Sequence, residues 1–260
     1  MASCLVGGLI AKDYPRALIR TSDPGEATRK KMRERHQILA INDNHALVEG
    51  ADIVVLAVKP QILESVAKGI APSLKTNCAV ISIAAGVPVR ALQRWLGKQT
   101  AIIRAMPNTP SLVLAGATGL FANPQVTTNQ RKSVDQLFKA VGVVSWLSSE
   151  TQIDAVTAVS GSAPAYFFLI FEIMQRIAQE LGLSEDAAYD LVLQTARGAT
   201  KMAATAEVDC AELRRQVTSA GGTTERALQI FDNGGLEDLF RCAMKGAVDR
   251  AQEMADDFAK

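Results

Sequence analysis

The residues best suited to chemistry stand in a run rich in hydroxyls and glycine, "QVTSAGGTTERALQIFD" (216–232), which an amphipathic helix pattern closes. The N–H groups at a helix start, together with the positive end of its dipole, bind anions without a cationic side chain. A substrate carboxylate would fit such a site, whereas the structural alternative is a glycine-rich turn with threonine as a helix cap. The residues concerned are Thr218, Ser219, Gly221, Gly222, Thr223 and Thr224.

Three other runs, "VLAVKPQ" (55–61), "ISIAAG" (81–86) and "IIRAMPNTP" (102–110), each end a predicted buried strand. Small or rigid residues follow each strand, where they would let a ligand approach the backbone. Three neighbouring strand ends of this kind predict a dinucleotide lying across one edge of a sheet. Each run alone would be read as a plain strand-to-helix turn, and no phosphate-binding glycine loop accompanies them.

The run "VSGSAPAY" (159–166) places Ser160, Gly161, Ser162 and Pro164 inside a long predicted helix. Proline costs about 3 kcal/mol in a helix interior and glycine about 1. The cluster therefore predicts a kink or a close packing contact with a purpose. The alternative is a kink that only bends the helix around the core.

The predicted secondary structure that must position these groups changes near residue 148. Before it, apolar strand patterns alternate with helical patterns such as 60–74 and 88–96, which predicts a parallel sheet covered on both faces. After it, only helical patterns occur. We therefore predict a Rossmann-like α/β domain over 1–148 and an all-α domain over 149–260. The strands are expected at 16–21, 52–58, 78–83, 100–105, 117–121 and 142–147, and the later helices at 150–181, 184–207, 209–218 and 222–258.

Composition excludes several function classes. The formal charge of the 260 residues is +1, so nothing favours a nucleic-acid groove or an anionic membrane surface. Four dispersed cysteines without a C-x-x-C pattern indicate free thiols in a reducing cytosol rather than a metal or redox site. The two histidines, His36 and His45, lie in a polar region and are expected at the surface.

The most apolar run, "APAYFFLIFEIM" (163–174), carries Glu172 and falls short of the roughly 20 residues that a membrane span needs. We interpret it as a buried helix at a subunit interface.

Taken together, these runs resemble the pyrroline-5-carboxylate reductase family over essentially the whole chain. "AVKPQ", "SIAAGV", "IRAMPNTP", "DAVTAVSGSAPAY" and "SAGGTTERAL" occur in the family's order and spacing, with Ala220 where proline is usual. Family members begin with a strand and a G-x-G-N-M-A turn, so this chain is expected to start just after the second glycine, with Ala2 at the third small position. The resemblance thus implies that the sheet's first strand and most of the pyrophosphate loop precede Met1.

The resemblance implies NADPH or NADH as the cofactor. Asp23 stands where many relatives have serine near the adenosine ribose, which would favour NADH, while Arg20 and Arg29 nearby could reverse that preference. Thr157 is expected near the nicotinamide. The full set of expected cofactor contacts is Ala2, Asp23, Asn44, Ala57, Val58, Lys59, Pro60, Ile83, Ala84, Ala85, Met106, Asn108 and Thr157.

The implied reaction is reduction of 1-pyrroline-5-carboxylate to L-proline. Thr224 is the expected catalytic residue, hydrogen-bonded to the ring nitrogen, and the expected substrate-binding residues are Glu150, Ser219, Gly222, Thr223 and Thr224. No metal is expected. The family's helical domains form dimers or rings of dimers, and the location is expected to be cytoplasmic, with no nucleic-acid or membrane partner.

Two rival hypotheses stay open at this point. A dehydrogenase of the β-hydroxyacid type needs a catalytic lysine on the interdomain helix, and residues 150–181 contain none. A non-catalytic oligomer that has lost its cofactor loop is the other.

Overall fold

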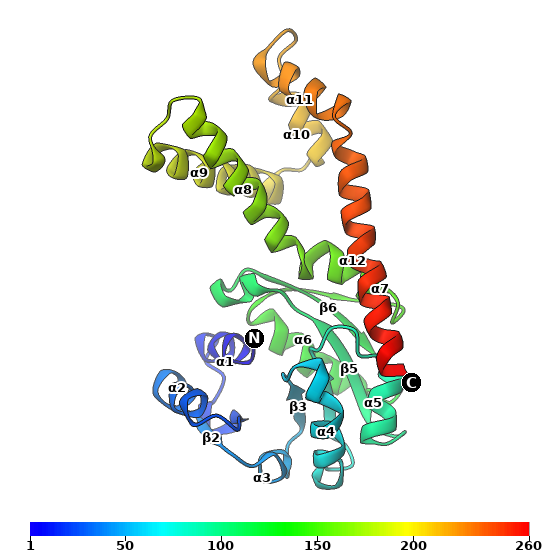
Figure 1. Cartoon of the computed structure of the whole chain (residues 1–260). Helices are drawn as coiled ribbons and strands as arrows, with labels where there is room; N and C mark the ends of the chain where they lie inside the picture. The colour runs from blue at the N-terminus through cyan, green and yellow to red at the C-terminus, as the bar shows by residue number, and fades with distance from the viewer. Residues whose placement is uncertain (260) are drawn as a thin grey trace. The chain divides into compact units, whose positions relative to one another are not determined.

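The computed structural model describes residues 1–259, which form two compact units. The sheet unit comprises Met1–Pro164 together with the chain from Gly246 onward, and the helical unit comprises Ala165–Lys245. The helical turns up to Pro164 and the end of the last helix thus pack with the sheet, which differs from a division after residue 148. Figure 1 shows the chain coloured from one terminus to the other.

The elements alternate as strands and helices through the sheet unit and are helical afterwards. In chain order they are α1 (Ala2–Ala11), η1 (Arg16–Leu18), β1 (Arg20–Ser22), α2 (Glu26–His36), β2 (Leu39–Ile41), α3 (Asn44–Val48), β3 (Ile53–Leu56), α4 (Pro60–Ile70), η2 (Ala71–Ser73), β4 (Ala79–Ser82), α5 (Val89–Leu96), β5 (Ala101–Met106), η3 (Thr109–Val113), β6 (Gly116–Ala122), α6 (Thr128–Lys139), β7 (Gly142–Trp146), α7 (Gln152–Val156), η4 (Thr157–Gly161), α8 (Ala163–Glu180), α9 (Glu185–Thr205), α10 (Cys210–Gln216), α11 (Thr223–Asn233) and α12 (Leu236–Ala259).

The strands form a five-stranded sheet of order β3-β4-β5-β6-β7 and a separate parallel pair, β1-β2. The prediction of a parallel sheet is wrong at one pair, because β5 and β6 run antiparallel. Only residues 107–115 join these two strands, and a parallel crossover needs a dozen or more residues. The parallel strands β3, β4 and β5 share one register, in which Leu56 pairs with Ser82 and Ser82 with Arg104, so their carboxyl ends meet at one edge.

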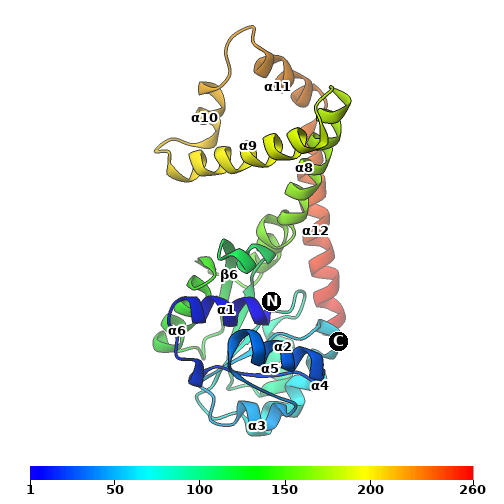
Figure 2. The same cartoon turned by 90° about the vertical axis from the view of Figure 1, so that its left-hand side faces the viewer.

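Helices cover both faces of the five-stranded sheet, as an almost continuously apolar strand such as "AVIS" in β4 requires. On one face Val80 and Ile102 pack with Leu63 of α4 and Leu92 of α5. On the other face the inner side chains of β4 to β6 pack with Leu5 of α1 and with α6. Figure 2 shows α1 beside α6 on this second face.

The prediction that His36 lies at the surface is wrong. Its side chain is buried against α1, where Nε2 stands 2.9 Å from the Ser3 hydroxyl oxygen. Helix α2 is polar, but Met32 and His36 are four residues apart and so share the one face that packs inward. His45, by contrast, is exposed as expected.

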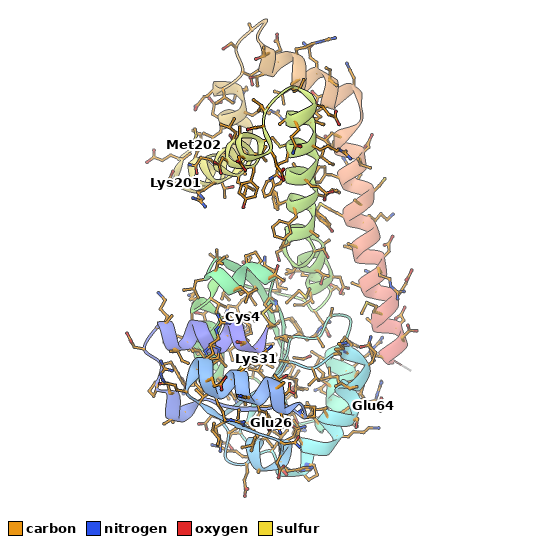
Figure 3. The ribbon with its side chains drawn as sticks, turned by 60° about the vertical axis from the view of Figure 1, so that its left-hand side comes forward. Cys4, Glu26, Lys31, Glu64, Lys201 and Met202 are labelled. Carbon is orange, nitrogen blue, oxygen red and sulfur yellow. The ribbon has the colours of Figure 1, made fainter. Side chains whose placement is uncertain are left out.

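The helical unit presents much of its apolar surface to solvent. The run 163–174 is not buried within the single chain, since Phe167, Phe168 and Leu169 are more than half exposed, and its burial at a subunit interface stays a prediction. Because the helix continues through α7, η4 and α8, the stretch Gln152–Glu180 is also long and apolar enough to cross a membrane by length and composition alone. On α9, Met202 likewise projects outward (Figure 3).

Candidate active site

The carboxyl edge of β3, β4 and β5 gathers three of the predicted cofactor-binding segments. Residues 57–60 follow β3, residues 83–85 follow β4, and Met106 ends β5. Ile83 continues the ladder by donating its N–H to the Leu56 carbonyl (3.3 Å), which holds the first two segments side by side. Ala57 is exposed whereas Ala84 is buried, so the chain after β3 is the more open of these two segments.

Two of the helices near the predicted ligand edge, α1 and α4, begin without a side-chain cap, whereas Asp43 caps α3. The N-cap residues Met1 of α1 and Lys59 of α4 make no such bond, whereas Thr127 caps α6 and Ser184 caps α9. The first N–H groups of any helix lack an intrahelical partner. Those of α1, which begins at Ala2, and of α4, which begins at Pro60, are therefore suited to phosphate or another anion.

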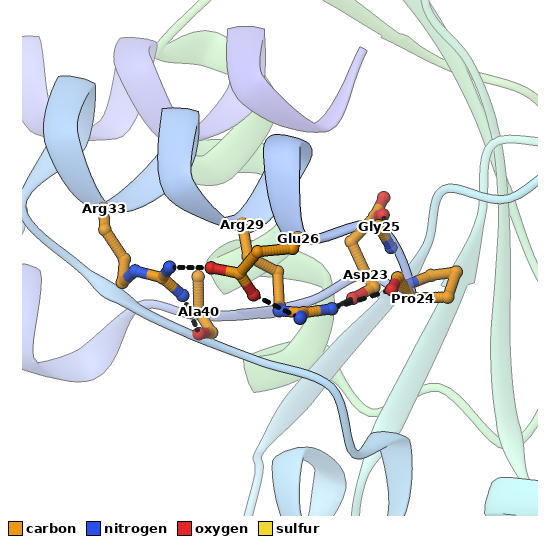
Figure 4. Close-up of polar contacts among 7 residues, drawn as sticks. All are labelled: Asp23, Pro24, Gly25, Glu26, Arg29, Arg33 and Ala40. Carbon is orange, nitrogen blue, oxygen red and sulfur yellow. Dashed lines mark hydrogen bonds and ion pairs between the residues drawn. The ribbon is translucent and has the colours of Figure 1, made fainter.

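The loop after β1 holds Asp23, the residue predicted to influence cofactor choice. Its Oδ1 accepts a hydrogen bond from the Gly25 N–H (2.8 Å), so one oxygen of the carboxylate closes its own turn (Figure 4). Asn44, the other predicted contact in this region, begins α3 just after β2 and is exposed.

Two arginines of α2 anchor that loop. Arg29 donates to the backbone carbonyls of Asp23 (2.7 Å) and Pro24 (2.8 Å) and pairs with Glu26, which also pairs with Arg33. These bonds, first with Arg33 and then with Arg29, lower the pKa of the Glu26 carboxyl. The loop next to the expected ribose position is thus fixed by Arg29, while Arg33 holds Glu26 and the Ala40 carbonyl of β2 (Figure 4).

Glu150, a predicted substrate-binding residue, links three elements of the sheet unit. Its Oε1 accepts from Arg104 of β5 (2.8 Å) and from the Val89 N–H at the start of α5 (2.7 Å). The Arg104 side chain is 5% exposed and that of Glu150 is 28% exposed. Sequence reasoning missed Arg104, although a lone charge inside the apolar strand "AIIRAM" was the available signal.

Asp154 lies close to this ion pair on α7. Burial raises the pKa of its carboxyl, an effect that Arg104 opposes and that the charge of Glu150 reinforces.

The predicted kink in the long helix is a π-helical turn, η4, which begins at Thr157. The Ser162 N–H donates to the Thr157 carbonyl (2.8 Å) and the Thr157 hydroxyl donates to the Ile153 carbonyl (2.9 Å). The close packing expected here is present, because a Cβ on Gly161 would lie 2.5 Å from Met106 Cε. Gly161, at the end of this turn, therefore lies against Met106 at the end of β5.

The hydroxyl-rich run lies in the helical unit, at the start of α11. Gly222 is the N-cap residue and makes no side-chain bond, so Thr223 and Thr224 are the first two helical residues and neither is the cap. Gly221 has a φ angle of +70°, which favours glycine, and its N–H donates to Glu225 Oε2 at 2.7 Å. The threonines are exposed, as is Ser219. The helix start therefore offers two backbone N–H groups and two hydroxyls to a ligand.

No group of three or more His, Cys, Asp or Glu side chains that could hold a metal ion occurs within residues 1–259.

A doubly covered sheet with uncapped helices at its carboxyl edge, followed by a helical unit, defines the class of two-part dinucleotide-binding oxidoreductases. Residues 1–86 match the family described as "NADP oxidoreductase coenzyme F420-dependent", and residues 150–254 match "Pyrroline-5-carboxylate reductase dimerisation". The chain belongs to the pyrroline-5-carboxylate reductase family.

Individual relatives agree with this assignment. The chain is 48% identical to a pyrroline-5-carboxylate reductase of Pseudomonas aeruginosa, over 98% of this chain and 94% of that protein. The structure of a pyrroline-5-carboxylate reductase from Coxiella burnetii matches with a TM-score of 0.93 and 43% identity, covering 98% and 94% of the two chains. A pyrroline carboxylate reductase of Plasmodium falciparum, solved with NADP bound, matches with a TM-score of 0.87 and 28% identity over 97% and 94%.

Proposed function

We propose that this protein reduces 1-pyrroline-5-carboxylate to L-proline with NADPH. The observation that carries the proposal is the start of α11, where Gly222 leaves the N–H groups of Thr223 and Thr224 without a side-chain cap. The family membership over 98% of the chain supports the same reaction.

The α11 start supplies the substrate contacts. The N–H groups of Thr223 and Thr224 would hold the carboxylate at the positive end of the helix dipole. The Thr224 hydroxyl would hydrogen-bond the ring nitrogen. Because the imine nitrogen is basic enough to arrive protonated, the protein need not supply a strong acid, and the Glu225 carboxylate of this turn is bonded to the Gly221 N–H.

The cofactor would bind along the carboxyl edge of the five-stranded sheet, on residues 57–60 and 83–85, with Asp23, Asn44, Met106, Asn108 and Thr157 beside it. Bound NADPH supplies the hydride that reduces C5 of the imine. The protein's contribution is to bind and orient the two reactants, and such positioning accounts for much of the rate in reactions of this type. A relative solved with NADP bound supports NADPH, and the positive charge of Arg29 at the loop after β1 would attract a 2′-phosphate.

The exposed apolar side chains of α8, among them Phe167, Phe168 and Leu169, would be covered in a homodimer or a ring of dimers. The match of residues 150–254 to a dimerisation family supports this assembly. A cytoplasmic location agrees with the free thiols of Cys4, Cys78, Cys210 and Cys242. Neither a membrane nor a nucleic acid is proposed as a partner.

The test is steady-state kinetics of the purified chain with NADPH and 1-pyrroline-5-carboxylate. We expect NADPH to be consumed and L-proline to appear in equimolar amounts. The matched control is 1-pyrroline-2-carboxylate, whose C=N bond lies beside the carboxylate carbon and which should react much more slowly. NADPH consumption without proline, or equal turnover of both isomers, would contradict the proposal.

A further inference from the structure

The long helix of the sheet unit contains a carbonyl that its own backbone leaves without the usual donor. In an α-helix the Ser160 carbonyl would accept from the N–H of residue 164, but residue 164 is proline and has none. The side-chain amide of Asn108 lies at this point, and its Nδ2 donates to the Ser160 carbonyl at 3.1 Å. A residue 52 positions away thus supplies the bond that Pro164 cannot make.

Both ends of the Asn108 side-chain amide form hydrogen bonds. Its Oδ1 accepts from the Ala117 N–H of β6 at 2.9 Å, and the residue is only 8% exposed. It also occupies the N-cap position of η3, where asparagine commonly caps its own helix, yet it makes no such bond. The amide is therefore used to join β5, β6 and η4, and its two partners fix which end carries oxygen.

The π-helical turn η4 and the residue before it pack closely against the sheet. A Cβ on Gly119 of β6 would lie 2.8 Å from both methyl groups of Val156, and one on Gly161 would meet Met106. A π-helical turn inserts an extra residue into the ladder of helix hydrogen bonds, and such turns occur frequently at functional sites. Removing the insertion would rotate neighbouring side chains by about 100°, which is one residue of an α-helix.

We propose that Asn108 is a positioning residue, which keeps the turn Thr157–Gly161 in its π-helical register and so fixes the position of Thr157, the residue expected beside the nicotinamide. This inference rests on the proposed function for what the turn faces. It assigns Asn108 a role in holding protein groups, in addition to any contact with the cofactor.

The variant Asn108→Asp tests the proposal, because it keeps the shape and the acceptor for Ala117 but loses the donor for Ser160. Asn123 offers a matched control, since it is 4% exposed, accepts from the Ile102 N–H (3.0 Å) and donates to the Thr100 carbonyl (3.0 Å) at the opposite end of the sheet. We expect Asn108→Asp and Asn123→Asp to lower the Tm to a similar extent. We expect kcat to fall by about tenfold or more only for Asn108→Asp, with the KM for the imine within about twofold of wild type.

Adding Pro164→Ala to the Asn108→Asp variant distinguishes a role of Asn108 in positioning the turn for catalysis from a role in stability alone. The new N–H at residue 164 can donate to the Ser160 carbonyl in the α-helical register, so the Tm should recover while kcat stays low. A kcat that recovers together with the Tm, or an equal loss of kcat in the Asn123→Asp control, would overturn the proposal. If the Asp variants do not fold, Asn108→Ala and Asn123→Ala give the same comparison. The comparison of Tm values does not depend on catalytic turnover. A wild-type chain that reduces no imine would therefore refute the proposed function and not the structural role of Asn108.

Discussion

Replacing Glu150 by glutamine should destabilise the sheet unit, because it leaves the buried guanidinium of Arg104 without its counter-charge. The substitution keeps the shape of the side chain and an oxygen that can still accept from Arg104 and from the Val89 N–H. Removing one partner of a buried ion pair costs about 3–5 kcal/mol. The Glu150 side chain is 28% exposed, so water screens part of the lost charge, and we expect a loss of about 2–3 kcal/mol in the free energy of unfolding.

Urea unfolding followed by circular dichroism measures this loss, and a Tm decrease of about 5–10 °C should accompany it. Asp52→Asn is the matched control, since the ion pair of Asp52 with Lys75 (2.5 Å) is exposed and should contribute less than about 1 kcal/mol. The double variant Glu150→Gln with Arg104→Met removes both charges and should recover much of the stability. A Glu150→Gln chain that is as stable as the Asp52→Asn control but has a raised KM for the imine would refute this reasoning, and would make Glu150 a substrate ligand rather than a tether.

Three further substitutions test other parts of the site. Thr224→Ala removes one hydrogen bond to a charged ring nitrogen, worth up to about 3 kcal/mol, so kcat/KM should fall by about tenfold to a hundredfold with the NADPH Kd unchanged. For His36, burial and the charges of Arg35 and Arg16 lower the pKa of the folded state, so stability is full above about pH 6.5 and is lost as pH falls toward that lowered pKa. In the His36→Gln variant the Tm should therefore fall less than in the wild type between neutral and acid pH. Asp23→Ser should raise the ratio of kcat/KM for NADPH to that for NADH, because it removes a negative charge beside the expected ribose position.

Each of these has an outcome that contradicts it. A destabilised but fully active Thr224→Ala enzyme would make that residue structural only. An equal acid-induced loss of Tm in wild type and His36→Gln would place the responsible group elsewhere. A cofactor ratio that does not change in Asp23→Ser would show that this carboxylate serves only its turn with Gly25.

The sequence was sufficient to predict those helices and strands that depend on a local pattern of residues. The apolar runs predicted the positions of β3 to β7, and the helical patterns at 60–74 and 88–96 correspond to α4 and α5. Strand β2 was missed because it has only three residues, of which Leu39 is exposed, so no alternation could reveal it. The antiparallel β6 was missed because strand direction depends on the length and path of the connection, which apolar content does not encode.

Contacts between distant residues explain the rest. The burial of His36 depends on α1 packing over a polar helix, and the ion pair of Glu150 depends on β5 bringing Arg104 to it. One such contact had a readable signal, because Pro164 lies four residues after Ser160 and thereby predicts that another group must serve that carbonyl. The identity of that group, Asn108, required the structure.

The most direct test of the proposed reaction follows the hydride itself. Wild-type protein is incubated with 1-pyrroline-5-carboxylate and NADPH that carries deuterium at C4 of the nicotinamide, on each face in turn, and the product is examined by NMR. We expect L-proline with deuterium at C5 from one of the two labelled cofactors and none from the other. Proline without deuterium from either cofactor, or no proline at all, would contradict it.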